Sequence, residues 1–272
     1  GISGLIGYYT LTFTAGALTV DQPITLTAGA ATQLAVTTSA AGASSGAAFT
    51  TQPVVAIRDA QGNVLLTDNS TVVTMSVSGA GTVVGTATAT ASAGVATFST
   101  VGISGLIGDY TLTFTAGALT PAGHDVTLGL GVATTLVLTT QAAGTDSSVA
   151  FPTQPVLEIR DAGNNVVTTD NATLVTMSVD NGATVFGTAT ATASSGIVTF
   201  VGVGITGADN TYTLSFDAAE LSGTTQQIIL LAPGLLITRA TAPMTAPPTS
   251  PTSRRAASSP PAGYALSARG NQ

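Results

Sequence analysis

Alternating apolar and hydroxyl side chains are the dominant pattern of this sequence, and one alternating stretch occurs three times. The copies read Tyr-Thr-Leu-Thr-Phe at residues 9–13 and 110–114, and Tyr-Thr-Leu-Ser-Phe at residues 212–216. Successive side chains of a β-strand point to opposite faces, so this spacing places Tyr, Leu and Phe on one face and the hydroxyls on the other. Each copy therefore predicts a strand with one buried face.

The copies are separated by 101 and 102 residues, which indicates an internal repeat. Such a unit has the length of one β-sandwich domain of ~100 residues. Residues 49–98 and 151–200 also correspond without a gap, including a Val-Thr-Met-Ser-Val stretch in each. We therefore expect an all-β chain built from duplicated sandwiches.

Comparison of the two copies predicts the turns and the buried face. Segments 54–59, 73–77, 86–92 and 95–98 are expected strands, and the turn at 59–63 contains Gly and Asn, which tolerate positive φ. Val55 and Ile57 correspond to Leu157 and Ile159, whereas Ala56 corresponds to Glu158. We therefore expect Glu158 and Arg160 to face water.

The repeat pattern divides the chain into four segments. Residues 1–29 repeat the end of a unit, since Gly1–Gly7 is identical to Gly102–Gly108, so we expect the final hairpin of an incomplete repeat and a piece of a longer array. Residues 30–130 and 131–232 are expected to form two sandwiches joined by a short linker near Gly129–Gly131. Residues 233–272 hold seven of the twelve prolines and are expected to form an extended Pro/Ser/Thr-rich tail.

Composition excludes several functional classes. The chain has no Cys and therefore neither disulfides nor thiolate metal sites. It has no Lys and a formal net charge of −7, so it lacks the basic surface that nucleic-acid binding requires. No apolar run approaches the ~20 residues of a membrane-spanning helix. This Thr-rich composition with few charges fits an extracellular setting.

Candidate catalytic residues are few. His124 is the only histidine and is followed by Asp125, in what we expect to be an exposed loop. If the protein were a hydrolase, His124 would have to be its base, but a catalytic triad needs a positioned partner that the sequence does not indicate. Glu158 and Glu220 are the only glutamates, and their role as a glycosidase pair would require a spacing that the sequence does not establish.

Other polar positions have a binding and a structural interpretation. Oxygen ligands for Ca²⁺ occur in both copies, although their spacing matches no Ca²⁺ loop and also suits turns: Asp59, Asn63 and Asp68, and Asp161, Asn165 and Asp170. Short Thr ladders could contact a glycan: Thr86, Thr88 and Thr90, and Thr188, Thr190 and Thr192. Asn69 and Asn171 fit the N-glycosylation pattern at turns. We favour the structural interpretation throughout and expect no catalytic, cofactor-binding or metal site.

One extended motif resembles a known family. The run Phe-x-x-Gln-Pro-Val-x-x-Ile-Arg-Asp-Ala-x-x-Asn, followed by Val-Thr-Met-Ser-Val and the Tyr-Thr-Leu-Thr-Phe strand, resembles the bacterial immunoglobulin-like (Big-type) tandem repeats of large surface and adhesin proteins. The resemblance covers residues 30–231 and also the preceding hairpin. It implies antiparallel, Greek-key immunoglobulin-like sandwiches in which the hydroxyls of Tyr110 and Tyr212 bond back to the backbone.

The resemblance implies a structural role at the cell surface, and the short linkers favour a stiff rod. We expect a spacer segment of an extracellular or adhesin-like protein whose partners are neighbouring repeats. An alternative is strand exchange with another copy of the chain through the hairpin Gly1–Ala28, giving a dimer or filament. A second alternative is a carbohydrate-binding module, with a glycan as partner, or a small hydrolase using His124.

Overall fold

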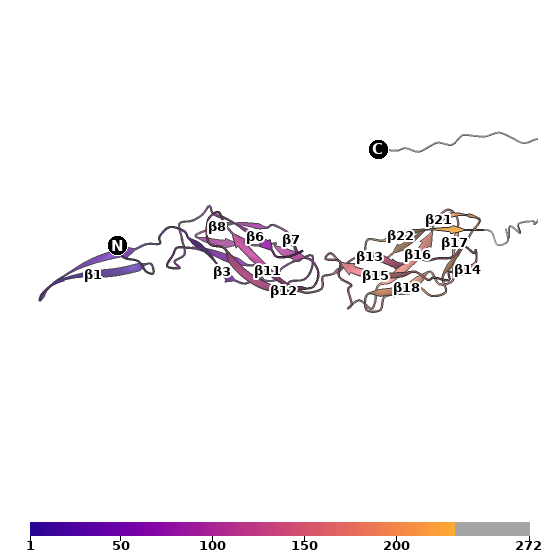
Figure 1. The fold of residues 1–272 in the computed structure, drawn as a ribbon, viewed down its shortest axis with the longest axis horizontal. Helices are drawn as coiled ribbons and strands as arrows, with labels where there is room; N and C mark the ends of the chain where they lie inside the picture. Colours follow the sequence, from indigo (N-terminus) through magenta and orange to yellow (C-terminus); the bar gives the residue numbers. More distant parts are fainter. Residues whose placement is uncertain (232–272) are drawn as a thin grey trace, which may run out of the picture. The chain divides into compact units, whose positions relative to one another are not determined.

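The computed structural model describes residues 1–231, and all regular secondary structure in this range is β-strand. The prediction of tandem immunoglobulin-like sandwiches is confirmed (Figure 1). The expected tail, residues 233–272, lies outside the described residues. Within the described range, no helix is long and apolar enough to span a membrane.

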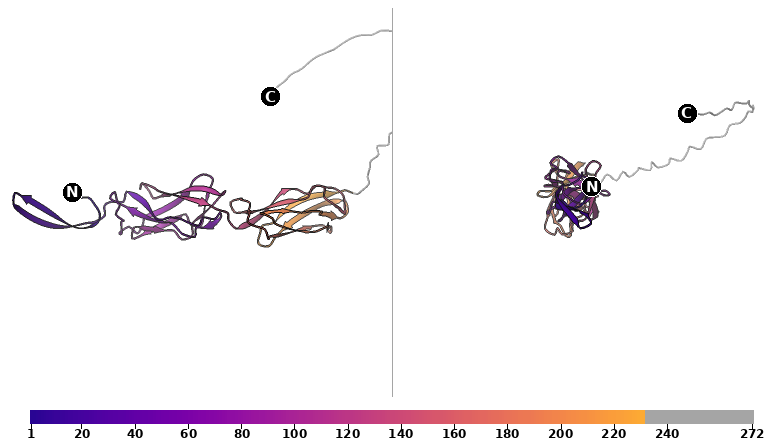
Figure 2. Two further views of the ribbon diagram at one scale, coloured as in Figure 1. Left: turned by 90° about the horizontal axis from the view of Figure 1, so that it is seen from below. Right: turned by 90° about the vertical axis from the view of Figure 1, so that its left-hand side faces the viewer.

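The chain begins with a hairpin of two strands, β1 (Gly7–Ala15) and β2 (Leu18–Leu26). They pair in antiparallel register from Gly7 opposite Leu26 to Ala15 opposite Leu18. The two strands form a sheet of their own, drawn in indigo in Figure 2. The two strands are longer than the alternating pattern indicated.

The first sandwich consists of β3 (Gln33–Thr38), β4 (Ala47–Ala48), β5 (Val54–Arg58), β6 (Val72–Val77), β7 (Thr82–Val84), β8 (Thr88–Ser92), β9 (Val95–Thr97), β10 (Gly102–Ser104), β11 (Gly108–Thr115) and β12 (Ala122–Leu128). Strand β8 belongs to both layers, because Thr88–Thr90 pairs with β6 and Ala91–Ser92 pairs with β9. Seven strands are consequently linked in the order β12-β11-β6-β8-β9-β5-β3.

The second sandwich repeats this arrangement with β13 (Ala133–Thr140), β14 (Val149–Ala150), β15 (Val156–Asp161), β16 (Leu174–Val179), β17 (Thr184–Phe186), β18 (Thr190–Thr192), β19 (Ile197–Thr199), β20 (Gly204–Thr206), β21 (Asn210–Asp217) and β22 (Thr224–Leu230). Its main sheets have the orders β13-β15-β19 and β18-β16-β21-β22. A third, small sheet has the order β14-β20-β17 and corresponds to β4-β10-β7 of the first sandwich.

Each sandwich has its own hydrophobic core, formed by the apolar faces that the alternation predicts. Phe114 and Phe216 are fully buried, and their rings lie 5.6 and 5.7 Å from those of Phe98 and Phe200. Burying one such side chain contributes about 1.5–3 kcal/mol. The two core clusters share no residue, since one lies within residues 34–128 and the other within residues 136–230.

The outer edges of each sandwich are joined to one another. In the first sandwich, Leu34 N donates to Thr120 O and Thr120 N donates to Thr32 O, both at 2.9 Å. In the second, Leu136 N donates to Ser222 O and Ser222 N donates to Thr134 O, also at 2.9 Å. These isolated bridges occupy some of the backbone groups at one end of the edge strands.

Candidate repeat-junction site

The most strongly hydrogen-bonded polar site is the turn after β15, which begins at Asp161 and ends at Asn165. Asp161 is 3% exposed, and its Oδ1 accepts hydrogen bonds from Gly163 N and Asn165 N, each at 2.9 Å. Its Oδ2 accepts from Gly131 N at 2.9 Å, which ties the turn to the linker before β13. Asn164 has a φ of 70°, like Gly62 of the first copy at 86°, so the predicted turn is confirmed.

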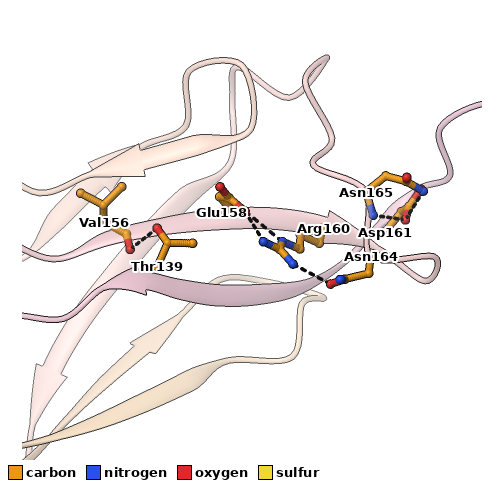
Figure 3. A network of polar contacts seen from close by, with 7 residues as sticks. All are labelled: Thr139, Val156, Glu158, Arg160, Asp161, Asn164 and Asn165. Atoms are coloured by element: carbon orange, nitrogen blue, oxygen red, sulfur yellow. Dashed lines mark hydrogen bonds and ion pairs between the residues drawn. The ribbon is translucent and has the colours of Figure 1, made fainter. Parts of the chain in front are cut away.

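Asn165 connects this turn to the preceding repeat. Its Nδ2 donates to Gly105 O at 2.9 Å, and its Oδ1 accepts from Ile107 N at 3.0 Å. Its Nδ2 also donates to both carboxylate oxygens of Asp161 at 3.0 Å. Figure 3 shows the two side chains facing each other across the turn. The Asp161 carboxylate therefore orients the amide that binds the 105–107 loop.

The same arrangement occurs one repeat earlier. Asn63 Nδ2 donates to Gly4 O and to Asp59 Oδ2, each at 2.9 Å, and Asn63 Oδ1 accepts from Ile6 N at 2.9 Å. Asp59 Oδ2 accepts from Gly29 N at 2.8 Å. We call each set a junction clasp; the first contains Asp59, Asn63, Gly29, Gly4 and Ile6, and the second contains Asp161, Asn165, Gly131, Gly105 and Ile107.

Hydrogen bonds set the charge state of both clasp carboxylates. The side-chain amide of Asn63, followed by the backbone N–H of Gly29, lowers the pKa of Asp59 to about 2. Burial by itself would raise the pKa of Asp161, but the donors on Gly131, Asn165 and Gly163 together lower it below its usual value. Both groups are consequently ionised over the physiological pH range.

The clasps do not suit Ca²⁺. A Ca²⁺ site needs six to eight oxygen ligands with free lone pairs, whereas the carboxylates of Asp59 and Asp161 face converging N–H donors. Asp68 serves a separate turn, where it accepts from Ser70 N and from both the backbone and hydroxyl of Thr71, and Asp170 does the same for its own turn. No cluster of three or more His, Cys, Asp or Glu residues that could hold a metal occurs in residues 1–231.

His124 lies on strand β12, so its expected place in an exposed loop is wrong. The ring is half-buried, and its Nε2 lies 3.0 Å from Ala40 O. The corresponding Gln226 binds the backbone of Ala142 through both its oxygen and its nitrogen. Asp125 is the next strand residue and therefore points to the opposite face, where it accepts from the Thr111 hydroxyl at 2.7 Å. The structure does not bring His124 and Asp125 together.

Glu158 is engaged in an ion pair. Its Oε2 accepts from Arg160 Nε at 2.9 Å, and Arg160 Nη1 donates to Asn164 Oδ1 at 2.8 Å (Figure 3). The two charged side chains lie on the face opposite Leu157, as predicted, but each is only 23% exposed. Glu220 lies outside this pair, in the connection between β21 and β22.

Most remaining candidates have structural contacts. The Asn69 and Asn171 oxygens accept from Ala93 N and Ser195 N at 2.8 Å, which stabilises turns. The Thr88 and Thr90 side chains are exposed and alternate with buried Ala89. The predicted tyrosine contacts are confirmed: the hydroxyls of Tyr110 and Tyr212 donate to Leu106 O and Ala208 O at 2.8 and 2.9 Å.

The sequence did not indicate that the clasp residues act between repeats. Asn165 and its partners Gly105 and Ile107 are separated by about sixty residues, and the Asp-Ala-x-x-Asn motif alone resembles an ordinary turn. One signal was available, because the turn motif and the Gly-Ile-Ser-Gly-Leu-Ile-Gly motif both occur twice in the chain. Each clasp uses one copy of each.

Comparisons with known proteins find no matching family model and no similar curated protein. Among solved structures, the chain is similar to the Escherichia coli adhesin FdeC, with 15% identity over 84% of this chain and 74% of that chain and a TM-score of 0.38. It is also similar to domains 5–6 of the S-layer protein SbsC, with 18% identity over 75% and 99% of the two chains and a TM-score of 0.26. A β-glycosidase from Bacteroides vulgatus matches with 8% identity over 74% of this chain but only 25% of its own, with a TM-score of 0.33. Similarity at this level carries no information about function.

Proposed function

We propose that this chain is a structural spacer, formed by consecutive immunoglobulin-like repeats of an extracellular surface or adhesin-type protein. The observation that carries this proposal is that equivalent atoms form the same clasp at both repeat junctions. A spacer needs junctions that resist bending, and a repeated contact provides this without a large interface.

The chemistry of the clasp supports a junction with little freedom. The Asn165 amide uses its donor and its acceptor on one loop, which restrains the loop in two directions. The linker is short, since β12 ends at Leu128 and β13 begins at Ala133. The turn at Gly163 also lies close to the 105–107 loop of the preceding repeat, because a Cβ added to Gly163 would lie 2.0 Å from Gly105 O.

A catalytic role has less support. The His124 ring binds a backbone carbonyl, and the Glu158 carboxylate is paired with Arg160. The Glu158 carboxylate cannot act as a general base without losing its contact with Arg160. A panel of ester and glycoside substrates, together with a glycan array, is expected to detect neither turnover nor binding. Activity that disappears in His124→Ala or Glu158→Gln would contradict the spacer proposal.

Small-angle X-ray scattering tests the spacer proposal. The wild-type chain is expected to scatter as an extended particle, and Asn165→Ala is expected to increase the flexibility evident in the scattering curve. Asn171→Ala is the matched control, because it removes an amide of the same sandwich that lies outside the clasp. A compact wild-type particle, or equal scattering from Asn165→Ala and wild type, would contradict the proposal.

A further inference from the structure

The N-terminal hairpin has one mainly apolar face, most of which is exposed. Alternate residues of β1 and β2 form this open face: Tyr9, Leu11, Phe13, Leu18, Val20, Ile24 and Leu26. Phe13 is 58% exposed, Leu18 is 77% exposed and Val20 is 64% exposed. An apolar surface of this kind on a soluble protein usually marks a site of interaction.

The same face is covered in both complete repeats. Leu112 and Phe114 of β11 correspond to Leu11 and Phe13, and both are fully buried. Leu128, which corresponds to Leu26, is 1% exposed. The covering residues come from the preceding strands of the same repeat, since this core also contains residues such as Leu34, Ile57 and Met75.

The backbone edge of the hairpin also lacks the strand that its counterparts have. Strand β11 pairs with β6, with Leu112 opposite Val77 and Phe114 opposite Met75. Strand β21 pairs with β16 in the same way. Within residues 1–231, β1 pairs with β2 alone. A Val-Thr-Met-Ser-Val strand could therefore pair with the edge of β1 in the same register. Its apolar side chains would then lie beside Leu11 and Phe13.

Gln22 gives independent evidence that the hairpin lacks the rest of a repeat. Gln22 of the hairpin occupies the position of His124 and Gln226, as the strand pairing with Leu11, Leu112 and Leu214 shows. Those two side chains reach the backbone of Ala40 and Ala142, which lie just after the first strand of each repeat. Gln22 is exposed and contacts only its neighbour Pro23 O in the described chain.

An intact second copy of the chain is a poor occupant. In both sandwiches the outer edges are joined by backbone bonds, such as Leu34 N to Thr120 O and Leu136 N to Ser222 O. In an intact copy, β6 is already paired with β11, and the equivalent strand β16 is already paired with β21. A segment that binds this face must therefore contain a β6-like strand that is not already paired with a hairpin of its own.

We propose that the open face of the hairpin binds the front half of a repeat of this same class, a segment equivalent to residues 30–101. Its β6-like strand pairs with β1, and its core side chains cover the open face. Gly1–Ser3 then takes the place of β10, because it repeats Gly102–Ser104. The proposal depends on strand complementarity and is independent of the spacer function.

The test uses the full chain with a second copy of residues 30–101 fused directly before Gly1, so that the repeat spacing is retained. In hydrogen exchange, the amides of β1 and β2 are expected to exchange at least about 100-fold more slowly than in the unfused chain, approaching the rates of β11 and β12. Binding of a hydrophobic dye to the unfused chain is expected to decrease on fusion.

The control is the same fusion with Val73→Asp and Met75→Asp in the added copy only, where both native side chains are buried. It is expected to leave β1 and β2 unprotected. Equal exchange in fused and unfused chains would overturn the proposal, as would equal protection by the control. Light scattering of the unfused chain provides a further check: a dimer with protected β1 and β2 would identify a second copy as the occupant and overturn the proposal.

Discussion

Asp161 and Asn165 belong to the same turn but hydrogen-bond to different parts of the chain. Asp161 collects N–H donors from its own turn and from the linker, whereas Asn165 extends to the 105–107 loop. Removing the carboxylate therefore leaves several N–H groups without an acceptor, while removing the amide releases the neighbouring repeat and takes away only one of the donors to Asp161. The two residues can be distinguished by substitution.

Asp161→Ala is expected to lower the free energy of unfolding of the second sandwich by about 2–3 kcal/mol, the typical loss when hydrogen bonds to a buried charged group are removed. Urea denaturation measures this loss. Asp146→Ala is the control, because Asp146 is exposed in a loop of the same sandwich. Equal midpoints for the two variants would show that the carboxylate does not stabilise the turn.

The pKa of Asp59 predicts a pH dependence. Its ordinary value of 3.8 is lowered to about 2 in the folded chain, so folding favours the carboxylate form. The stabilisation is therefore complete above about pH 4 and is lost as the pH falls towards 2. In thermal unfolding at several pH values, the difference in Tm between wild type and Asp59→Asn is expected to shrink between pH 4 and pH 2. A constant difference over that range would refute this assignment.

At the scale of strands and turns, the strong alternating segments could be predicted from the sequence, and several of the shortest strands could not. Val73–Val77 lies in a strand whose alternate residues are buried, as expected. Strands β4, β7 and β10 have only two or three residues each, too few for a recognisable alternation. They form because distant segments pair, which local propensity does not reveal.

Two glycines in turns of the first sandwich provide a matched test. Both have positive φ, 75° for Gly94 and 86° for Gly62. A Cβ on Gly94 would lie 2.4 Å from Leu65 O, whereas one on Gly62 would meet nothing within 4 Å. Gly62→Ala is expected to cost about 1–2 kcal/mol of stability from backbone strain alone, and Gly94→Ala roughly twice as much because of the added contact. Equal losses in urea denaturation would contradict this.

At the scale of the whole molecule, duplication was evident from the sequence, and the way in which repeats meet was not. The Asp and Asn positions predicted turns in both copies, which the structure confirms. Their partners lie in a loop of the preceding repeat, and no local pattern indicates which loop that is. The contact of His124 with Ala40 could not be predicted for the same reason, because the two residues are 84 positions apart in the sequence.

We propose that the clasp restrains the junction between the two sandwiches. Residual dipolar couplings of backbone amides in one alignment medium test it directly, with Asn171→Ala again as the control. In the wild-type chain and in the control, the couplings of both sandwiches are expected to fit a single alignment tensor, whereas Asn165→Ala is expected to require two tensors of unequal magnitude. Two unequal tensors for the wild-type chain, or a single tensor that persists in Asn165→Ala, would contradict the account.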